Sequence, residues 1–328
     1  MKLLARLLVV AVTAALCAVL LRGLRLEEVT AALRRADWRL VALAVFANLT
    51  FNTGARVYRF RALLGRLPRA DRGAGWWELC SLLLASYAAS NLLPARAGEA
   101  LRTVQLNRRH GYTVGALVGA QLFEKLIEGL SLGLLALPAA IWAEAPGPLR
   151  VPLFAFAALG VGGVTALFVL GRFVFSDGPS AVEEESDPAP GGSRRLAITA
   201  RRFLRRLGDG IRLLHATPVW GRALAWSCAS DLADGAMIGL CLHAIGLPLP
   251  IGSWVVVLLA INLAIALPST PAQVGVFEAG AVLALKAFGV PEAPALAFAV
   301  VYHAAHVVPT TAAGLVGLRL LSWRDDAR

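Results

Sequence analysis

Charged residues are scarce in this chain. They make up 16% of its 328 residues, whereas 58% are hydrophobic and the mean hydropathy is +0.67. Soluble domains carry about 25% charged and about 45–50% apolar residues. The balance excludes an ordinary soluble domain and indicates an integral membrane protein.

Cysteine and the common catalytic motifs are also in short supply. The four cysteines all lie in apolar stretches without a CxxC or Cys/His ligand spacing, which argues against disulfides and structural zinc. The sequence has no P-loop, dinucleotide fingerprint, GxSxG or HExxH. We therefore expect no cofactor and no metal.

Lysine is rare, because 29 of the 32 basic residues are arginine, and the net charge is +11. The arginines stand between apolar runs, where they act as topology determinants. We therefore expect no nucleic-acid partner.

Apolar stretches long enough to cross a bilayer core of about 30 Å recur along the chain. Seven are clear: 3–21, 38–55, 115–141, 151–170, 223–245, 251–267 and 293–317. The first has no small-x-small cleavage site, so we interpret it as an uncleaved span. Two shorter segments, 76–93 and 274–289, are more typical of re-entrant helices.

Loop charges give an orientation, because short cytoplasmic loops collect arginine. Loops are predicted at 56–72, with six arginines, and at 94–114, with four, and both are expected in the cytoplasm. Segment 76–93 must then enter and leave on one side. The four arginines of the 22–37 loop argue weakly against this scheme, and the position of the C-terminus stays open.

The region 170–222 is predicted to be a cytoplasmic loop inside a single domain, 1–328. Its first half is acidic and rich in Pro, Gly and Ser, which is typical of disorder. Residues 194–216 combine an apolar stripe with six arginines on other faces. This pattern predicts an amphipathic helix on anionic headgroups or an ordinary juxtamembrane helix.

The two short segments share a plan. Residues 92–111 and 266–289 each contain Leu-Pro, small residues, a Gly, a nearby Glu and a helical run that ends at Gly. Paired interrupted helices are a sequence pointer to a transport site at the bilayer midplane. We infer an internal repeat, with chance similarity in a chain rich in Ala, Leu and Gly as the alternative.

Several charges fall inside the apolar stretches, where each costs about 2.5–3.5 kcal/mol. Glu124 and Glu128 share a helix face, and Lys125 lies beside them. These three residues form a static ion pair, snorkel towards the membrane surface, or belong to a polar path. For Asp231 and Asp234 we expect a partner, which is Arg96 or Arg102, a substrate cation or a proton. The alternative is that Asp231 caps a helix that begins there.

Two histidines, His303 and His306, precede Pro309, which we expect to break or bend its helix. Hydrogen bonds to neighbouring helices are a better explanation for this pair than half of a metal site.

The broken segments carry the clearest chemistry. Pro94 and Pro268 stop a helix, Gly98 and Gly275 permit a close or left-handed backbone, and the new helix presents free N–H groups that attract phosphate. Arg96 and Arg102 can bind a phosphodiester through paired hydrogen bonds. Glu99 and Glu278 are expected to hold these arginines, cap the helices or meet a cationic headgroup.

These residues resemble a known family. Three ordered motifs resemble the lysylphosphatidylglycerol synthase transmembrane family, also called flippase-like or UPF0104 proteins: Pro94, Arg96, Gly98, Glu99 and Arg102; Glu124, Lys125 and Glu128; and Pro268, Pro271, Gly275 and Glu278. The resemblance implies a polytopic inner-membrane protein that moves lipids between leaflets.

The chain departs from the family pattern in three respects. The usual Glu-Arg-x-x-Asp is Glu124-Lys125-x-x-Glu128 here, and the usual Gly-Gly after Pro271 is Ala272-Gln273, which stiffens the turn. The full synthase also carries a large aminoacyl-transferase domain, for which this chain has no room. We therefore expect no lysine transfer.

The sequence thus predicts an all-α polytopic membrane protein with seven or eight transmembrane helices and two re-entrant, broken helices. The leading hypothesis is a flippase or scramblase for an anionic or phosphate-bearing lipid, with the three motifs and Asp231 and Asp234 in its path. The alternatives are a membrane transferase that uses these two aspartates with a divalent ion, and an accessory subunit that anchors a partner through 194–216. The oligomeric state stays open.

Overall fold

The computed structural model describes residues 26–71, 73–93, 97–142, 147–174, 219–266 and 271–326. This part of the chain is helical and contains no strand, as the composition predicts. The predicted first span at 3–21 and the amphipathic helix at 194–216 lie outside the described residues.

One long helix carries most of the polar chemistry. It consists of α3 (Trp38–Ala47), a π-helical turn η1 (Asn48–Asn52) and α4 (Thr53–Leu64), without a break. The predicted loop at 56–72 is therefore wrong for residues 56–64. The physical reason is that no glycine or proline occurs between Arg56 and Gly65, and that Arg56 and Arg59 find partners inside the bundle.

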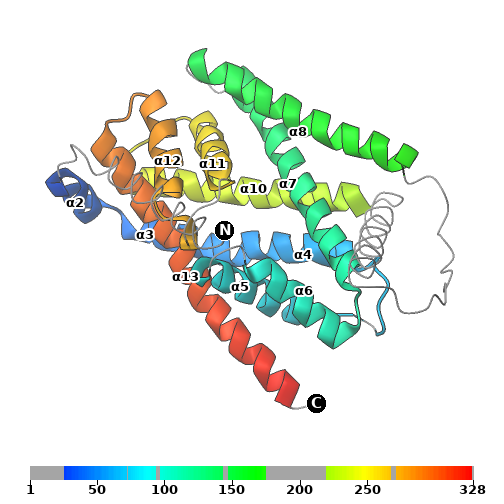
Figure 1. Ribbon diagram of the computed structural model, residues 1–328. Coiled ribbons are helices and arrows are strands. Elements are labelled where there is room, and N and C mark those ends of the chain that lie inside the picture. The colour runs from blue at the N-terminus through cyan, green and yellow to red at the C-terminus, as the bar shows by residue number, and fades with distance from the viewer. Residues whose placement is uncertain are drawn as a thin grey trace, which may run out of the picture.

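The described residues form four further long helices: α7 (Val114–Trp142), α8 (Gly147–Val174), α10 (Val219–Ala244) and α13 (Glu292–Asp326). Of these, α7, α10 and α13 contact the long helix, whereas α8 packs against α7. In Figure 1, α10 runs beside α3 and α4, which it contacts along its length. Pro309 lies inside α13, so the predicted break is wrong, and the alternative of a bend stays a prediction. The Thr310 hydroxyl donates to the His306 carbonyl oxygen at 2.6 Å.

The shorter helices form two pairs, each interrupted by a break. One pair is α5 (Trp76–Leu92) and α6 (Ala97–His110), so the predicted loop at 94–114 is wrong for 97–110. The other is α11 (Ile251–Ile265) and α12 (Val276–Ala287), with the short η2 (Pro271–Gln273) between them. The remaining helix, α2 (Leu26–Arg35), occupies much of the predicted 22–37 loop.

Glycines allow the helices of each pair to approach closely. A Cβ at Gly98 would lie 1.9 Å from the Ser86 carbonyl oxygen on α5, and one at Gly280 would lie 2.9 Å from that of Ala260 on α11. Small residues at helix interfaces serve this purpose in membrane proteins. The two pairs meet where η2 contacts α5, and α13 packs against both α5 and α12.

Backbone contacts define two ends of the bundle. At one end, the Arg109 side chain donates to the Leu321 carbonyl oxygen at 2.7 Å, and the Ala70 N–H donates to that of His110 at 3.1 Å. Tyr112 is buried there, which raises the pKa of its phenol. At the other end, the Asp37 N–H donates to the Ala244 carbonyl oxygen at 2.8 Å. The C-terminal end of α13 thus lies with the arginine-rich ends of α4 and α6.

Within the described residues, two helices are long and apolar enough to cross a membrane, Trp38–Leu64 and Glu292–Leu321. Leu153–Gly163 and Ile251–Ile265 are apolar but shorter. The predicted count of seven or eight spans and the re-entrant course of the short pairs stay predictions.

Candidate functional site

Polar side chains line one face of the long α3–η1–α4 helix. Asn48, Asn52, Arg56 and Arg59 follow one another at intervals of four, four and three residues, so they share a face. At about 1.5 Å per residue, this row is about 16 Å long, half the thickness of a bilayer core. Its first member begins the π-helical turn, a feature frequent at functional sites.

Arg59 is the centre of a buried ion cluster. Its side chain is 2% exposed, and Nη2 donates to Glu124 at 2.7 Å and to Glu128 at 2.5 Å, while Nη1 donates to Ser227 at 3.0 Å. Both carboxylates come from α7, where they lie one turn apart. The predicted acidic pair therefore neutralises an arginine that the sequence interpretation had placed in a loop.

Arg102 of α6 completes this cluster. Its Nη1 lies 3.2 Å from the second Glu124 oxygen, and its guanidinium lies 4.8 Å from the centre of the Phe60 ring. The Nε groups of both Arg59 and Arg102 are buried without a hydrogen-bond partner. Two strong donors are thus available inside the bundle to an anion that enters it.

The cluster reaches the surface through Lys125 and Glu99. Lys125 is 44% exposed, and its Nζ lies 2.9 Å from Glu128 and 4.0 Å from Glu99, which is itself 36% exposed. Glu99 contacts no arginine within the described residues, so its predicted role of holding Arg96 or Arg102 receives no support there.

The second arginine of the row, Arg56, pairs with Asp234 of α10. Its Nη2 lies 2.8 Å from the carboxylate, and its Nε donates to Asn52 and Ser230, each at 3.0 Å. Asn52 also donates to Asp234 at 2.6 Å. The predicted pairing of Asp234 with Arg96 or Arg102 is wrong for Arg102, which instead binds Glu124.

Asp231 occupies a different environment from Asp234. It accepts a hydrogen bond from the Ser131 hydroxyl of α7 at 2.5 Å. The alternative that Asp231 caps a helix is wrong, because α10 passes through this residue without interruption. Asp234 binds Arg56 and Asn52, so the two aspartates have different hydrogen-bond partners. No three His, Cys, Asp or Glu side chains of the described residues gather to hold a metal ion.

The row continues through histidine to the second broken segment. Asn48 lies 3.4 Å from His306, and one turn away His303 lies 2.5 Å from Glu278. Glu278 also accepts a hydrogen bond from the backbone N–H of Gly275. Gly275 directly precedes α12 and has a φ of 87°. The predictions of histidines bonded to neighbouring helices, of a capping glutamate and of a left-handed glycine are confirmed.

These groups form two neighbouring hydrogen-bonded clusters along one face of the long helix, one around Arg56 and one around Arg59, and together we call them the polar file. Its members are buried or half-buried and come from α4, η1, α6, α7, α10 and α13: Asn48, Asn52, Arg56, Arg59, Arg102, Glu124, Glu128, Asp234 and His306. Its arginines can bind a phosphate, and its carboxylates can bind a cation.

The structure thus brings together most of the predicted site residues that it describes. Pro94, Arg96 and Pro268 lie outside the described residues, and Gly98 serves helix packing. The sequence interpretation missed Arg56, Arg59 and Asn52, because the two arginines were counted as loop charges. Their spacing on a helical face and the absence of glycine and proline between Arg56 and Gly65 would have identified the two arginines.

Comparison with known proteins agrees with the resemblance seen in the sequence. A family model described as the lysylphosphatidylglycerol synthase TM region matches residues 4–314, nearly the whole chain. A search of curated proteins finds no match.

Proposed function

The chain belongs to the lysylphosphatidylglycerol synthase transmembrane family, and from this premise we propose that it moves a phosphate-bearing lipid between the leaflets of the cytoplasmic membrane. The family indicates a membrane protein tied to lipid metabolism. To this, the proposal adds lipid translocation as the activity, a phosphate-bearing lipid as the substrate and the cytoplasmic membrane as the location.

The polar file is the observation that supports the proposal. A headgroup cannot cross hydrocarbon unless its polar groups are compensated. Arg59 and Arg102 each hold a carboxylate and keep a buried Nε–H without a partner. A lipid phosphate would accept from these donors and compete with Glu124 for the guanidinium groups.

A transport path also needs an entrance and a continuation. Lys125 and Glu99 provide charged, half-exposed side chains at one end of the file, and His306, His303 and Glu278 extend it to the break before α12. Glu278 and His303 would bind a cationic group of the lipid headgroup or carry a proton. The proposal covers both downhill scrambling and proton-coupled transport.

The test measures the movement of fluorescent phosphatidylglycerol across proteoliposome membranes. We expect Arg59→Lys and Glu278→Gln to slow movement by about 10- to 100-fold, because a hydrogen bond to a charged group contributes about 1.5–3 kcal/mol. Lysine keeps the charge of Arg59 but lacks its planar guanidinium fork and the Nε–H that is left for a phosphate.

The matched control is Arg39→Lys, since Arg39 is an exposed arginine on the same long helix. It should leave the rate unchanged. Folded Arg59→Lys protein with wild-type rates would remove the polar file from the path. Wild-type protein that moves neither phosphatidylglycerol nor a polyprenyl phosphate would contradict the proposed activity.

A further inference from the structure

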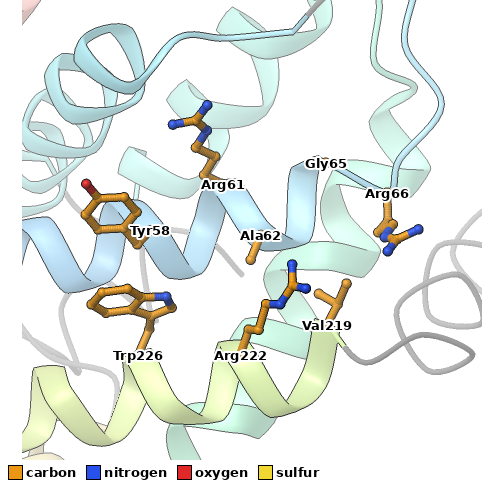
Figure 2. Close-up of a pocket in the computed structure, with 8 residues that line it drawn as sticks. All are labelled: Tyr58, Arg61, Ala62, Gly65, Arg66, Val219, Arg222 and Trp226. Carbon is orange, nitrogen blue, oxygen red and sulfur yellow. The ribbon is translucent and has the colours of Figure 1, made fainter.

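A surface cavity of about 400 Å³ lies where the C-terminal end of α4 meets the N-terminal end of α10. Figure 2 shows Tyr58 and Arg61 on α4, Arg66 just after it, and Arg222 and Trp226 on α10. The cavity is open to the surface, so it can receive a group at the edge of the bundle without enclosing it. We call it the arginine cavity.

The arginine cavity is distinct from the polar file. Arg61 follows Arg59 by two residues, which places the two side chains about 200° apart around the helix. Arg59 is buried, whereas Arg61, Arg66 and Arg222 are exposed. The file therefore faces the interior of the bundle and the cavity faces outward.

The three arginines around the cavity have unused binding capacity. Within the described part of the chain, no carboxylate pairs with Arg61, Arg66 or Arg222. Positive charges that have no counter-charge among the described residues repel one another, and an anion relieves this repulsion. Guanidinium groups bind phosphate through two parallel hydrogen bonds, which makes phosphate the anion that suits them best.

The surroundings favour a lipid as the source of that phosphate. Tyr58 and Trp226 stack with ring centroids 4.8 Å apart, and aromatic rings beside arginines are typical of the membrane–water interface. Two turns before Tyr58, the Phe51 side chain is 71% exposed on a helix able to span the membrane. Acyl chains would continue along this apolar surface.

We propose that the arginine cavity binds the phosphate of an anionic lipid headgroup at the arginine-rich end of the bundle. Basic residues near that end attract the anionic cytoplasmic leaflet. The lipid bound here lies outside the polar file, so the inference holds whether or not the chain translocates lipid.

The test is a native mass spectrometry titration of the detergent-purified chain with dioctanoyl phosphatidylglycerol, dioctanoyl phosphatidylcholine and glycerol 3-phosphate. All proteins carry Arg59→Lys, so that binding in the polar file is weakened throughout. The cavity variant combines Arg61→Gln, Arg66→Gln and Arg222→Gln. The control combines Arg35→Gln, Arg39→Gln and Arg108→Gln, which removes the same charge from exposed arginines elsewhere.

We expect phosphatidylglycerol to bind in preference to the other two ligands, and the cavity variant to bind it about 100-fold more weakly, roughly fivefold for each arginine. The control should bind as its parent does. Equal losses in both triple variants, equal binding of phosphatidylcholine, or glycerol 3-phosphate bound as tightly as the lipid would each overturn the proposal. The transport assay with Arg59→Lys tests the polar file separately. Failure of the proposed lipid site is therefore distinguishable from failure of the proposed translocation.

Discussion

At the scale of single residues, the buried charges of this chain stand out. Arg59, Glu124 and Arg102 are held together where each alone would be costly. Buried ion pairs contribute little to stability compared with apolar packing of the same volume. Their presence is better explained by a task that needs charge inside the bundle.

Removal of one member of this ion cluster should nevertheless destabilise the fold. We expect Glu124→Gln to lower the free energy of unfolding by about 3–5 kcal/mol, because it leaves two buried guanidinium groups without their shared anion. Equilibrium unfolding in mixed SDS and detergent micelles measures the change. As control, Glu292→Gln removes a carboxylate 2.9 Å from Lys286, but both side chains are exposed, so the loss should stay below about 1 kcal/mol. Equal losses would mean that burial does not govern the cost.

At the scale of elements, the two interrupted helix pairs depend on their breaks and close contacts. Gly98 and Gly280 let one helix rest on the backbone of its partner. Between α11 and α12, Ala272 and Gln273 have φ values of 54° and 62°, a left-handed backbone that favours glycine. The Ala272 carbonyl oxygen accepts from His303 Nε2 at 2.8 Å, which helps to hold this turn.

The turn before α12 should therefore tolerate glycine. A left-handed residue other than glycine costs about 1–2 kcal/mol, partly offset by the entropy of glycine in the unfolded chain. We expect Ala272→Gly with Gln273→Gly to stabilise the protein by about 1 kcal/mol in the same unfolding assay. Ala279→Gly inside α12 is the matched control and should destabilise by about 1 kcal/mol. Destabilisation by the turn glycines would show that the side chains themselves hold the turn.

The contact between α5 and α6 should be intolerant of any side chain at Gly98. The Cβ of Gly98→Ala would meet the Ser86 carbonyl oxygen at 1.9 Å, which forces the helices apart. We expect a loss of about 1–3 kcal/mol or more, together with a lower melting temperature in detergent. Gly54→Ala, where nothing lies within 4 Å, should be neutral or stabilising. A melting temperature unchanged by Gly98→Ala would contradict the close packing.

At the scale of the whole molecule, the ends of the bundle define a topology. The Asp37–Ala244 contact lies at the opposite end from Arg66 and from the Arg109–Leu321 contact. The inside-positive rule assigns the arginine-rich end to the cytoplasm. We therefore expect the C-terminal end of α13 to be cytoplasmic as well.

Cysteine labelling in intact cells tests this topology. In a chain without its four native cysteines, Gly246→Cys, beyond the α10 end, should react with an impermeant maleimide added outside. Arg66→Cys and Arg319→Cys should react only after the membrane is opened. Labelling of all three from outside would contradict the arrangement, and outside labelling of Arg66→Cys and Arg319→Cys without Gly246→Cys would reverse the orientation.

Part of this fold and site was predictable from local patterns. Helices around 115–141, 223–245 and 293–317 follow from apolar runs, and the cap that Gly275 forms with Glu278 follows from their spacing of three residues. The arginines of α4 were misassigned because a charge count does not distinguish a residue in a loop from one on the inner face of a helix. Pairing of Arg56 with Asp234 joins residues 178 positions apart, which no local pattern specifies.

The sequence by itself determined the helical, membrane-embedded class, the family and the presence of charges that hydrocarbon alone does not tolerate, because composition and short-range periodicity act along the chain. Only the tertiary structure decided which charges meet, since Arg59 reaches Glu124 and Glu128 across helices and Arg61, two residues later, faces outward. The polar file and the arginine cavity both follow from that packing, because an unpaired charge inside a bundle is costly and its partner is chosen by proximity in space.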